Sequence, residues 1–293
     1  MYAELPTEGV DESGVELDRL DPAEIARRLL TAEEEAVAAV RGCLGDIGEV
    51  CAAAVKALSR GGRIVYAGAG TSGRLGVLDA AEMGPTFGAE SGRVVALLAG
   101  APDALTEAVD GAEDDAVAGA AALEAIDPGP ADLVLGISMS GTAAFVRGVL
   151  EAAARAGSTR AVLTANPAAP LRADLHIHLD LGPELLAGST RLKGGSATKT
   201  VLNMISTAAM AGTGAVYRNL MVRVRPTNMK LRDRAERLVV RLAEVSRDEA
   251  AGLLRRASDD VSIAVLMARL DVGSAAARDR LDAAGGSLRE ALS

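Results

Sequence analysis

Two short, hydroxyl-rich segments of the sequence have the residue types of a phosphate-binding site. The first, Gly68–Arg74 (GAGTSGR), follows the apolar run Arg63–Ala67 and precedes the helical stretch Leu75–Ala81. The second, Ser138–Thr142 (SMSGT), directly follows Leu133–Ile137. Glycines let the backbone approach an anion, and hydroxyls with amide hydrogens can surround a phosphate without a metal or a lysine. The predicted phosphate-binding residues are Gly70, Thr71, Ser72, Gly73, Ser138, Ser140, Gly141 and Thr142. The alternative is that each segment is only a Gly/Ser turn.

The G-x-G-x-x-G spacing of the first segment also matches the fingerprint of dinucleotide-binding enzymes, so a nicotinamide cofactor has to be weighed. That fingerprint expects an acidic residue about 20 positions on, at the end of the next strand, where it binds the ribose. Here the next strand-like run, Val94–Leu98, ends in Ala99 and Gly100, and Glu90 precedes it. A phosphomonoester is therefore favoured over NAD, and no cofactor is expected.

Two glutamates near these segments are candidates for acid–base catalysis. Glu82 lies at the end of the helix that the first segment begins, and Glu113 lies in EAVDGAEDDA. Removing a proton next to a carbonyl and expelling an alkoxide needs one base and one acid, and two carboxyl groups in different environments can share those roles. An isolated glutamate on a helix is more often solvated, and spacing alone does not decide between the two interpretations.

A third segment, Gly188–Gly195 (GSTRLKGG), stands immediately before a long helical stretch. Its hydroxyls and cations suit a sugar phosphate or a carboxylate, so Ser189, Thr190 and Lys193 are further candidates for substrate binding. A helix cap followed by solvated charges fits the same residues equally well.

The two histidines do not make a convincing metal site. His176 and His178 alternate on one face of the run Leu175–Leu179, and only Asp174 and Asp180 stand nearby as further ligands. A half-exposed strand face is the simpler interpretation, so no metal is predicted.

The elements that must position these residues alternate between strands and helices. The expected strands are Arg63–Ala67, Val94–Leu98, Leu133–Ile137, Arg160–Thr164 and Leu175–Leu179, the last with the alternation of an edge strand. Apolar strands separated by helices indicate an α/β fold with a parallel sheet of about five strands, covered on both faces. Ligands of such sheets bind at the carboxyl ends of the strands, where the strand order reverses. The two hydroxyl-rich segments are expected to converge there.

Helical segments flank the predicted sheet. Residues 1–20 show no periodic pattern and are expected to form an irregular arm, and residues 21–62 are expected to form two helices. A long helix is expected over Ser196–Gly212. Three short helices are expected near Arg247–Ala257, Val261–Leu270 and Ser274–Ala284. We therefore divide the chain into an arm (1–20), an α/β domain with leading helices (21–234) and a helical C-terminal domain (235–293).

Composition narrows the possible partners. The chain has 293 residues, a formal net charge of −9 and 49% apolar residues. Binding to nucleic acid needs a clustered basic surface, which this acidic chain does not suggest. No stretch approaches the roughly 18 consecutive apolar residues of a membrane span, and the acidic start is unlike a signal peptide. We expect a cytoplasmic protein with a small phosphorylated ligand, no membrane partner, and buried thiols at Cys43 and Cys51.

Taken together, the motifs resemble those of N-acetylmuramic acid 6-phosphate etherases, a branch of the sugar-isomerase (SIS) proteins. The similar stretches are VYAGAGTSGRLGVLDAAEMGPTFG, EAVDGAEDDA, GPELLAGSTRLKGGSATKTVLNMISTAAM and YRNLMVRVRPTNMKLRDRA. They cover residues from about 60 to 235, and the C-terminal DAAGGSLREAL is similar to the family's small, UBA-like three-helix domain. The resemblance implies an SIS-type three-layer αβα sandwich.

The resemblance also implies an activity and a set of site residues. It implies a homodimer with active sites near the subunit interface, which cleaves the lactyl ether at C3 of the sugar, with N-acetylglucosamine 6-phosphate and D-lactate as products of cell-wall sugar recycling. It places Glu82 at the position thought to protonate the departing lactate and Glu113 at the one suited to act at C2. Glu184, in the third stretch, joins the expected substrate-binding residues.

The sequence departs from the family pattern at two places. The family usually continues Thr-Glu with Arg-Asn-Pro near its start, whereas here Thr7-Glu8 leads into Gly9–Glu12. The family's second loop usually reads Ser-Gly-Arg-Thr-Pro-Tyr, whereas here Thr142 stands in place of the arginine. Losing one charge-assisted hydrogen bond weakens binding by roughly ten- to a hundredfold. A non-catalytic SIS-domain sugar-phosphate sensor, or a lyase for another sugar phosphate, is therefore the alternative.

Overall fold

The structure, a computed structural model, describes residues 5–11 and 15–293, so parts of the predicted arm (1–4 and 12–14) lie outside the described residues. Residue contacts divide the chain into two compact units, Met1–Ala80 with Val94–Ser206 and Ala81–Arg93 with Thr207–Ser293. The first unit holds both hydroxyl-rich segments, and the second holds the C-terminal helices. This grouping differs from the boundary expected after residue 234.

Five parallel strands form the sheet of the first unit, in the order β2-β1-β3-β4-β5. Their bounds are β1 Ile64–Gly68, β2 Val94–Leu98, β3 Leu133–Ile137, β4 Thr159–Thr164 and β5 Leu175–His178. Every residue of β1 and β3 is buried, as their continuous apolar runs predict. From β1 the chain passes to β2 on one side and then to β3 on the other, so the strand order reverses at β1 and β3. The predicted parallel sheet, with the Leu175 run at an edge, is confirmed.

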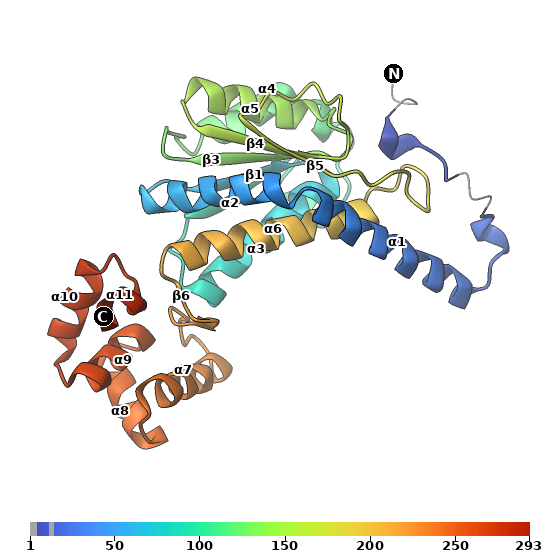
Figure 1. Ribbon diagram of the computed structural model, residues 1–293. Helices are drawn as coiled ribbons and strands as arrows, with labels where there is room; N and C mark the ends of the chain where they lie inside the picture. The colour runs from blue at the N-terminus through green and yellow to red at the C-terminus, as the bar shows by residue number, and fades with distance from the viewer. Residues whose placement is uncertain (1–4, 12–14) are drawn as a thin grey trace. The chain divides into compact units, whose positions relative to one another are not determined.

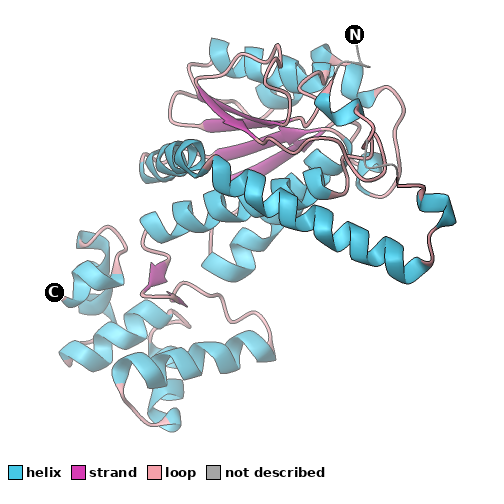
Figure 2. Ribbon diagram, turned by 45° about the vertical axis from the view of Figure 1, so that its right-hand side comes forward, coloured by secondary structure: helices cyan, strands magenta, loops and turns pink. Residues whose placement is uncertain are grey.

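Helices cover both faces of the sheet (Figures 1 and 2). On one face lie α4 (Ala116–Glu124) and α5 (Ala144–Arg155), and on the other lie α2 (Leu44–Ser59), α3 (Gly70–Phe87) and α6 (Lys193–Gly212). The first pair packs very closely, because a Cβ added at Gly148 of α5 would stand only 1.9 Å from the Ala116 carbonyl oxygen. The small residues at this contact therefore let the two helices approach each other closely. The three-layer sandwich is confirmed.

The N-terminal segment begins with short turns and continues into a long helix. Two 3-10 turns, Pro6–Glu8 and Leu17–Arg19, precede α1 (Pro22–Gly42). The Asp21 carboxylate accepts a hydrogen bond from the Glu24 amide at 2.8 Å, which fixes where α1 begins. In Figure 1, α1 extends past the edge of the sheet. Among the helices of the described residues, none combines the length and apolarity needed to cross a membrane.

A buried ion pair ties the beginnings of the two central strands. Asp132, which is 4% exposed, accepts hydrogen bonds from the amide and the guanidinium of Arg63 at 2.8 and 2.7 Å. Burial opposes ionisation of the Asp132 carboxyl, but the hydrogen bonds from Arg63 and from the Gly129 amide outweigh it and lower its pKa. The pair therefore holds the amino ends of β1 and β3 together. The hydroxyl-rich segments lie at the other, carboxyl ends of these strands.

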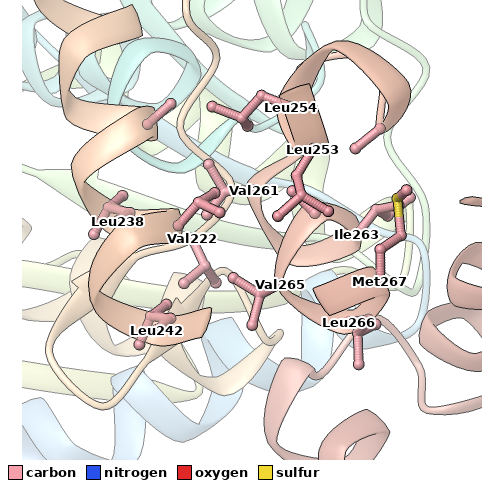
Figure 3. Packing of buried hydrophobic residues seen from close by; sticks show 14 of the residues in the cluster. Val222, Leu238, Leu242, Leu253, Leu254, Val261, Ile263, Val265, Leu266 and Met267 are labelled. Carbon is pink, nitrogen blue, oxygen red and sulfur yellow. The ribbon is translucent and has the colours of Figure 1, made fainter. Parts of the chain in front are cut away.

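The second unit is mainly helical and has its own core. Its elements include a hairpin of β6 (Val216–Tyr217) and β7 (Leu220–Met221) and the helices α7 Met229–Ala243, α8 Arg247–Arg256, α9 Val261–Leu270, α10 Ser274–Ala283 and α11 Leu288–Leu292. The three expected helices correspond to α8, α9 and α10. Figure 3 shows Val261 and Val265 of α9 packed with Val222 and Leu238 in the core. Because Val222 precedes residue 235, the core of this unit begins upstream of the expected boundary.

Candidate active site

The first hydroxyl-rich segment joins β1 to α3 in a very tight turn. A Cβ added at Gly73 would stand 2.5 Å from both the Gly68 carbonyl oxygen and Leu98 Cδ1. Only glycine therefore lets the first turn of α3 pack directly on the end of β1. Thr71 and Ser72 consequently lie at the N-terminal end of α3, where amide groups without helical partners point outward.

The second hydroxyl-rich segment is held by its own hydrogen bonds and by Asn166. Ser138 Oγ accepts a hydrogen bond from the Gly141 amide at 3.1 Å, and the hydroxyl oxygens of Ser140 and Thr142 lie 2.9 Å apart. Gly141 has a positive φ of 71°, and a Cβ there would stand 2.3 Å from Ala169 Cβ. The Asn166 amide donates to the Ser140 carbonyl at 2.9 Å. These hydrogen bonds fix the loop before any ligand binds.

The two segments line one pocket of about 290 Å³ at the carboxyl ends of β1 and β3. Its lining residues are Leu5, Thr7, Glu8, Ala69, Gly70, Thr71, Ser72, Glu113, Ile137, Ser138, Met139, Ser140, Thr142, Ala143, Gly188 and Thr190. Hydroxyl groups dominate the polar lining, and none of the described lining residues is an arginine or a lysine. An anion in this pocket has hydroxyls, amides and the α3 N-terminus as partners.

Glu113 reaches the pocket from a short 3-10 turn, Ala112–Asp114, that follows β2. Between β2 and this turn, Arg74 donates hydrogen bonds to the Ala104 carbonyl at 2.7 Å and to the Glu107 carbonyl at 2.6 Å. Arg74 thus fastens the connection after β2 to the second turn of α3. Glu113 is exposed, so its carboxylate is available to a ligand.

The third segment contributes unequally to the pocket. Thr190 lines it, whereas Ser189 does not. Glu184, 3% exposed, accepts hydrogen bonds from the Lys193 and Gly194 amides at 3.2 and 2.9 Å and so caps α6. Burial raises the pKa of Glu184, although these amides favour its charged form.

Lys193 belongs to a neighbouring cavity rather than to the hydroxyl-lined pocket. It is 3% exposed, and its Nζ lies 2.6 Å from a carboxylate oxygen of Glu35 on α1. The cavity that it lines measures about 330 Å³ and lies between α1, the arm and the loop Leu181–Leu185. Lys193 and Glu184 therefore support the third segment, whereas Thr190 lines the pocket.

A buried polar network supports the pocket from behind. The Tyr66 hydroxyl of β1 donates to Asp79 of α3 at 2.9 Å, and the Ser206 hydroxyl of α6 donates to the other Asp79 oxygen at 3.0 Å. Burial raises the pKa of both the Asp79 carboxyl and the Tyr66 hydroxyl. The network fixes α3 against β1 and α6, and thereby the position of the turn at its N-terminus.

The histidines and cysteines lie away from this pocket. His176 contacts the Ala173 carbonyl oxygen at 3.1 Å, and the described residues contain no group of three or more His, Cys, Asp or Glu side chains arranged to hold a metal. Cys43 is buried, Cys51 is partly buried, and both are free thiols.

Comparison with known proteins adds sequence relationships to this geometry. Residues 46–154 match the family model of the glucokinase regulatory protein N-terminal SIS domain. The chain is 47% identical over 280 residues to the N-acetylmuramic acid 6-phosphate etherase of Salmonella dublin, covering 95% of this chain and 94% of that protein. It is 46% identical over 288 residues to the etherase of Cutibacterium acnes, covering 98% of this chain and 95% of that protein. The chain belongs to the N-acetylmuramic acid 6-phosphate etherase family.

The fold of this etherase-family chain also has a relative of known structure. A Bacteroides fragilis chain assigned as a phosphosugar isomerase involved in capsule formation superposes with a TM-score of 0.50 at 20% identity, covering 70% of this chain and 98% of that chain. This likeness concerns the fold alone.

The expected etherase site residues fall into two groups. Gly70, Thr71, Ser72, Glu113, Ser138, Ser140, Thr142 and Thr190 line the pocket. Gly73, Gly141, Glu184, Ser189 and Lys193 do not, and Gly73, Gly141 and Glu184 instead shape its walls. Glu82 is exposed in the second compact unit and does not line this pocket either, so a catalytic role for it stays a prediction.

Sequence reasoning did not select several residues that the pocket uses. Arg74 and Asn166 act on loops that lie 30 and 26 positions away in the chain, a relationship that no local pattern reveals. Thr7 and Glu8 line the pocket from the arm. In the sequence, only the Thr-Glu pair that the family also has near its start pointed to them.

Proposed function

We propose that the protein cleaves the D-lactyl ether of N-acetylmuramic acid 6-phosphate, giving N-acetylglucosamine 6-phosphate and D-lactate. The observation that carries the proposal is a hydroxyl-rich pocket with Glu113 in its lining, at the strand-order reversal, in a chain 47% identical to an etherase. The substrate joins a phosphomonoester to a sugar with an acidic C2 proton, and this pocket offers partners for both.

The phosphate is held by the two loops that end β1 and β3. Thr71, Ser72 and Ser140 supply hydroxyl donors, and the N-terminus of α3 supplies amide donors and the positive end of its dipole. This arrangement fixes one end of the substrate, which places the sugar carbons at a set distance from the base.

The chemistry begins once the sugar ring has opened and exposed the C1 aldehyde. The aldehyde makes the C2 proton acidic, and Glu113 removes that proton as general base. The C2 electrons form a C2=C3 double bond while the C3–O bond breaks and its electron pair leaves with lactate. Glu82 is proposed to donate the proton that the departing lactate oxygen takes up.

Hydration completes the reaction. Water adds to C3 of the unsaturated aldehyde, and a proton returns to C2, so the scheme balances with water as the only co-substrate. The C1 carbonyl takes up the electron density of the C2 carbanion, so the scheme needs no oxidant, reductant or metal. These steps make the enzyme a carbon–oxygen lyase of the hydro-lyase type.

The decisive experiment measures D-lactate after the purified protein is incubated with N-acetylmuramic acid 6-phosphate. We expect lactate from the wild type and very little from Glu113→Ala or Glu82→Ala. A second assay follows deuterium exchange at C2 of N-acetylglucosamine 6-phosphate in deuterated water. Exchange without lactate release would mean that the base works on a different natural sugar phosphate.

Two observations favour a second candidate, a non-catalytic sugar-phosphate sensor. Residues 46–154 match a regulatory protein's SIS domain, and no described arginine or lysine lines the pocket. A sensor binds N-acetylglucosamine 6-phosphate but neither releases lactate nor exchanges the C2 proton. The presence of Glu113 in the pocket makes the lyase the preferred proposal.

The proposed setting is a cytoplasmic homodimer that recycles cell-wall amino sugars. Support for the dimer comes from Leu30 and Val37 of α1, which are 66% and 54% exposed and stand seven residues apart. Apolar side chains repeated at this spacing lie along one side of a helical segment and suit a partner helix. A second copy of the chain is the proposed partner.

A further inference from the structure

The N-terminal arm brings two side chains into the pocket that the proposed mechanism has not used. Thr7 and Glu8 belong to the 3-10 turn Pro6–Glu8 and line the same pocket as Thr71, Ser140 and Glu113. The arm lies against residues 183 and 188, because Gly9 approaches Pro183 and a Glu8 carboxylate oxygen stands against Gly188. A Cβ at Gly188 would come within 3.2 Å of that oxygen.

Thr7 carries an unsatisfied polar group at this position. The residue is 4% exposed, and its Oγ1 is buried without a hydrogen-bond partner among the described residues. Buried hydroxyls are nearly always paired, because an unpaired one has lost its water and gained nothing in return. A ligand group entering the pocket that Thr7 lines is the natural partner.

Glu8 indicates which part of the ligand lies near the arm. Its carboxylate is exposed in the pocket lining and would repel a phosphate dianion, whereas it readily accepts hydrogen bonds from sugar hydroxyls or an amide N–H. The proposed phosphate donors are instead the hydroxyls and amides of the loops after β1 and β3. The arm therefore faces the sugar and not the phosphate.

We propose that Thr7 and Glu8 are specificity-determining residues that bind the sugar portion of the phosphorylated amino sugar. Thr7 Oγ1 pairs with a sugar oxygen or N–H, and the Glu8 carboxylate accepts from a hydroxyl or an amide. This inference rests on the proposed function for its ligand, and it assigns to the arm a direct role in selecting that ligand.

The test compares two ligands by calorimetry on the full chain, N-acetylglucosamine 6-phosphate and inorganic phosphate. Thr7→Val keeps the shape and removes the hydroxyl, so affinity for the sugar phosphate is expected to fall roughly 3- to 10-fold while affinity for phosphate is unchanged. Thr7→Ser restores the hydroxyl and should bind within about twofold of wild type. Because the unpaired hydroxyl is gone, the melting temperature of ligand-free Thr7→Val should stay the same or rise.

Glu8→Gln gives a change of opposite sign for the two ligands. Sugar-phosphate binding should weaken by a few-fold, while phosphate binding should strengthen, because a repulsive charge has been removed.

The matched control for Thr7→Val is Thr31→Val, since Thr31 lines the neighbouring cavity and its hydroxyl already donates to the Arg27 carbonyl.

Each outcome decides the matter. Equal loss of both ligands in Thr7→Val, no loss of the sugar phosphate, or a loss that Thr7→Ser shares would overturn the inference. Failure of the proposed function looks different, because the wild type would then release no D-lactate from N-acetylmuramic acid 6-phosphate whatever the arm variants bind.

Discussion

At the scale of single residues, the pocket combines many neutral donors with few charges. Its hydroxyls and amides can bind a phosphate, but each neutral hydrogen bond contributes only about 0.5–1.5 kcal/mol, so affinity depends on their number and placement. The proposed catalysis depends instead on carboxylates, and Glu113 lines the pocket from the 3-10 turn that follows β2. The two functions can therefore be separated by substitution.

Glu113→Gln should separate chemistry from binding. The amide keeps the size of the side chain but is not a base, so D-lactate release should fall by about 10²–10⁴-fold while calorimetric affinity for N-acetylglucosamine 6-phosphate changes little. The matched control is Asp114→Asn in the same 3-10 turn, which should retain activity. Wild-type rates in Glu113→Gln would remove this residue from the mechanism.

Thr142→Arg should tighten ligand binding. Thr142 lines the pocket, and a guanidinium there adds a charge-assisted hydrogen bond to phosphate worth roughly ten- to a hundredfold in affinity. Titration with N-acetylglucosamine 6-phosphate measures the gain. Thr159→Arg adds the same charge at the amino end of β4 and controls for net charge. Equal affinities of Thr142→Arg and wild type would show that the loop does not contact the phosphate.

The predicted residues line the pocket where they follow one another closely in sequence, and their binding roles stay predictions. Thr71 and Ser140 were found because a strand, a glycine and a hydroxyl follow one another along the chain. Asn166 was missed because its contact with Ser140 arises only when β3 and β4 lie side by side. The buried state of Glu184 and its capping of α6 likewise depend on folding, so its residue type alone suggested substrate binding.

At the scale of elements, the site depends on how closely α3 approaches β1. The contact requires glycine at position 73 and is locked by Asp79, which receives hydrogen bonds from the neighbouring strand and helix. Displacing α3 would move the phosphate-binding amides directly.

Gly73→Ala should therefore be costly although alanine favours helices. The added Cβ would overlap the Gly68 carbonyl oxygen and Leu98, and such overpacking costs about 1–3 kcal/mol. Gly48→Ala, in α2 with no atom within 4 Å of its added Cβ, should instead stabilise by about 0.5–1 kcal/mol. Urea unfolding measures both changes, and equal stability of the two variants would contradict the close packing.

The Arg63–Asp132 pair should make stability depend on acid pH. Because the pKa of Asp132 is lower in the folded protein than in the unfolded chain, its contribution is present above its ordinary pKa and is lost as pH falls through the folded value. Asp132→Asn should cost about 1.5–3 kcal/mol at pH 7, and the difference from wild type should shrink in acid. Urea unfolding at a series of pH values checks this, and a difference independent of pH would contradict it.

All five strands of the parallel sheet were predicted, whereas one long helix was missed. Val94–Leu98 and Leu133–Ile137 are observed with the expected bounds, because a short, continuous apolar run bounded by turn residues strongly favours a buried strand. The helix Met229–Ala243 was not anticipated. Its many charged residues concealed the apolar stripe that includes Leu231, Leu238 and Leu242.

At the scale of the whole molecule, the sequence predicts a domain boundary after residue 234. Residue contacts in the structure group Thr207–Ser293 with Ala81–Arg93 in one compact unit. The sequence shows where charge density changes, but it does not show that Val222 packs against α9. Membership of a core is a property of the fold that a change in charge density does not reveal, so the domain boundary after residue 234 stays a prediction.

The proposed homodimer predicts a change in molar mass on one substitution. Val37→Glu places a charge in the exposed stripe of α1, and light scattering should show a monomer where the wild type is a dimer. Val117→Glu, on α4 at a position 80% exposed, controls for the loss of an exposed apolar side chain and should leave the mass unchanged. A dimer in Val37→Glu would move the interface elsewhere.

The charge of the chain also affects how fast a ligand reaches the pocket. The described lining residues include no arginine or lysine, and the chain has a net charge of −9. Long-range repulsion opposes the approach of a dianion, so encounter is slower than diffusion alone would allow. Added salt screens this repulsion over about 10 Å at 0.1 M. Stopped-flow association rates should accordingly increase with ionic strength, the reverse of what an arginine-lined receptor shows.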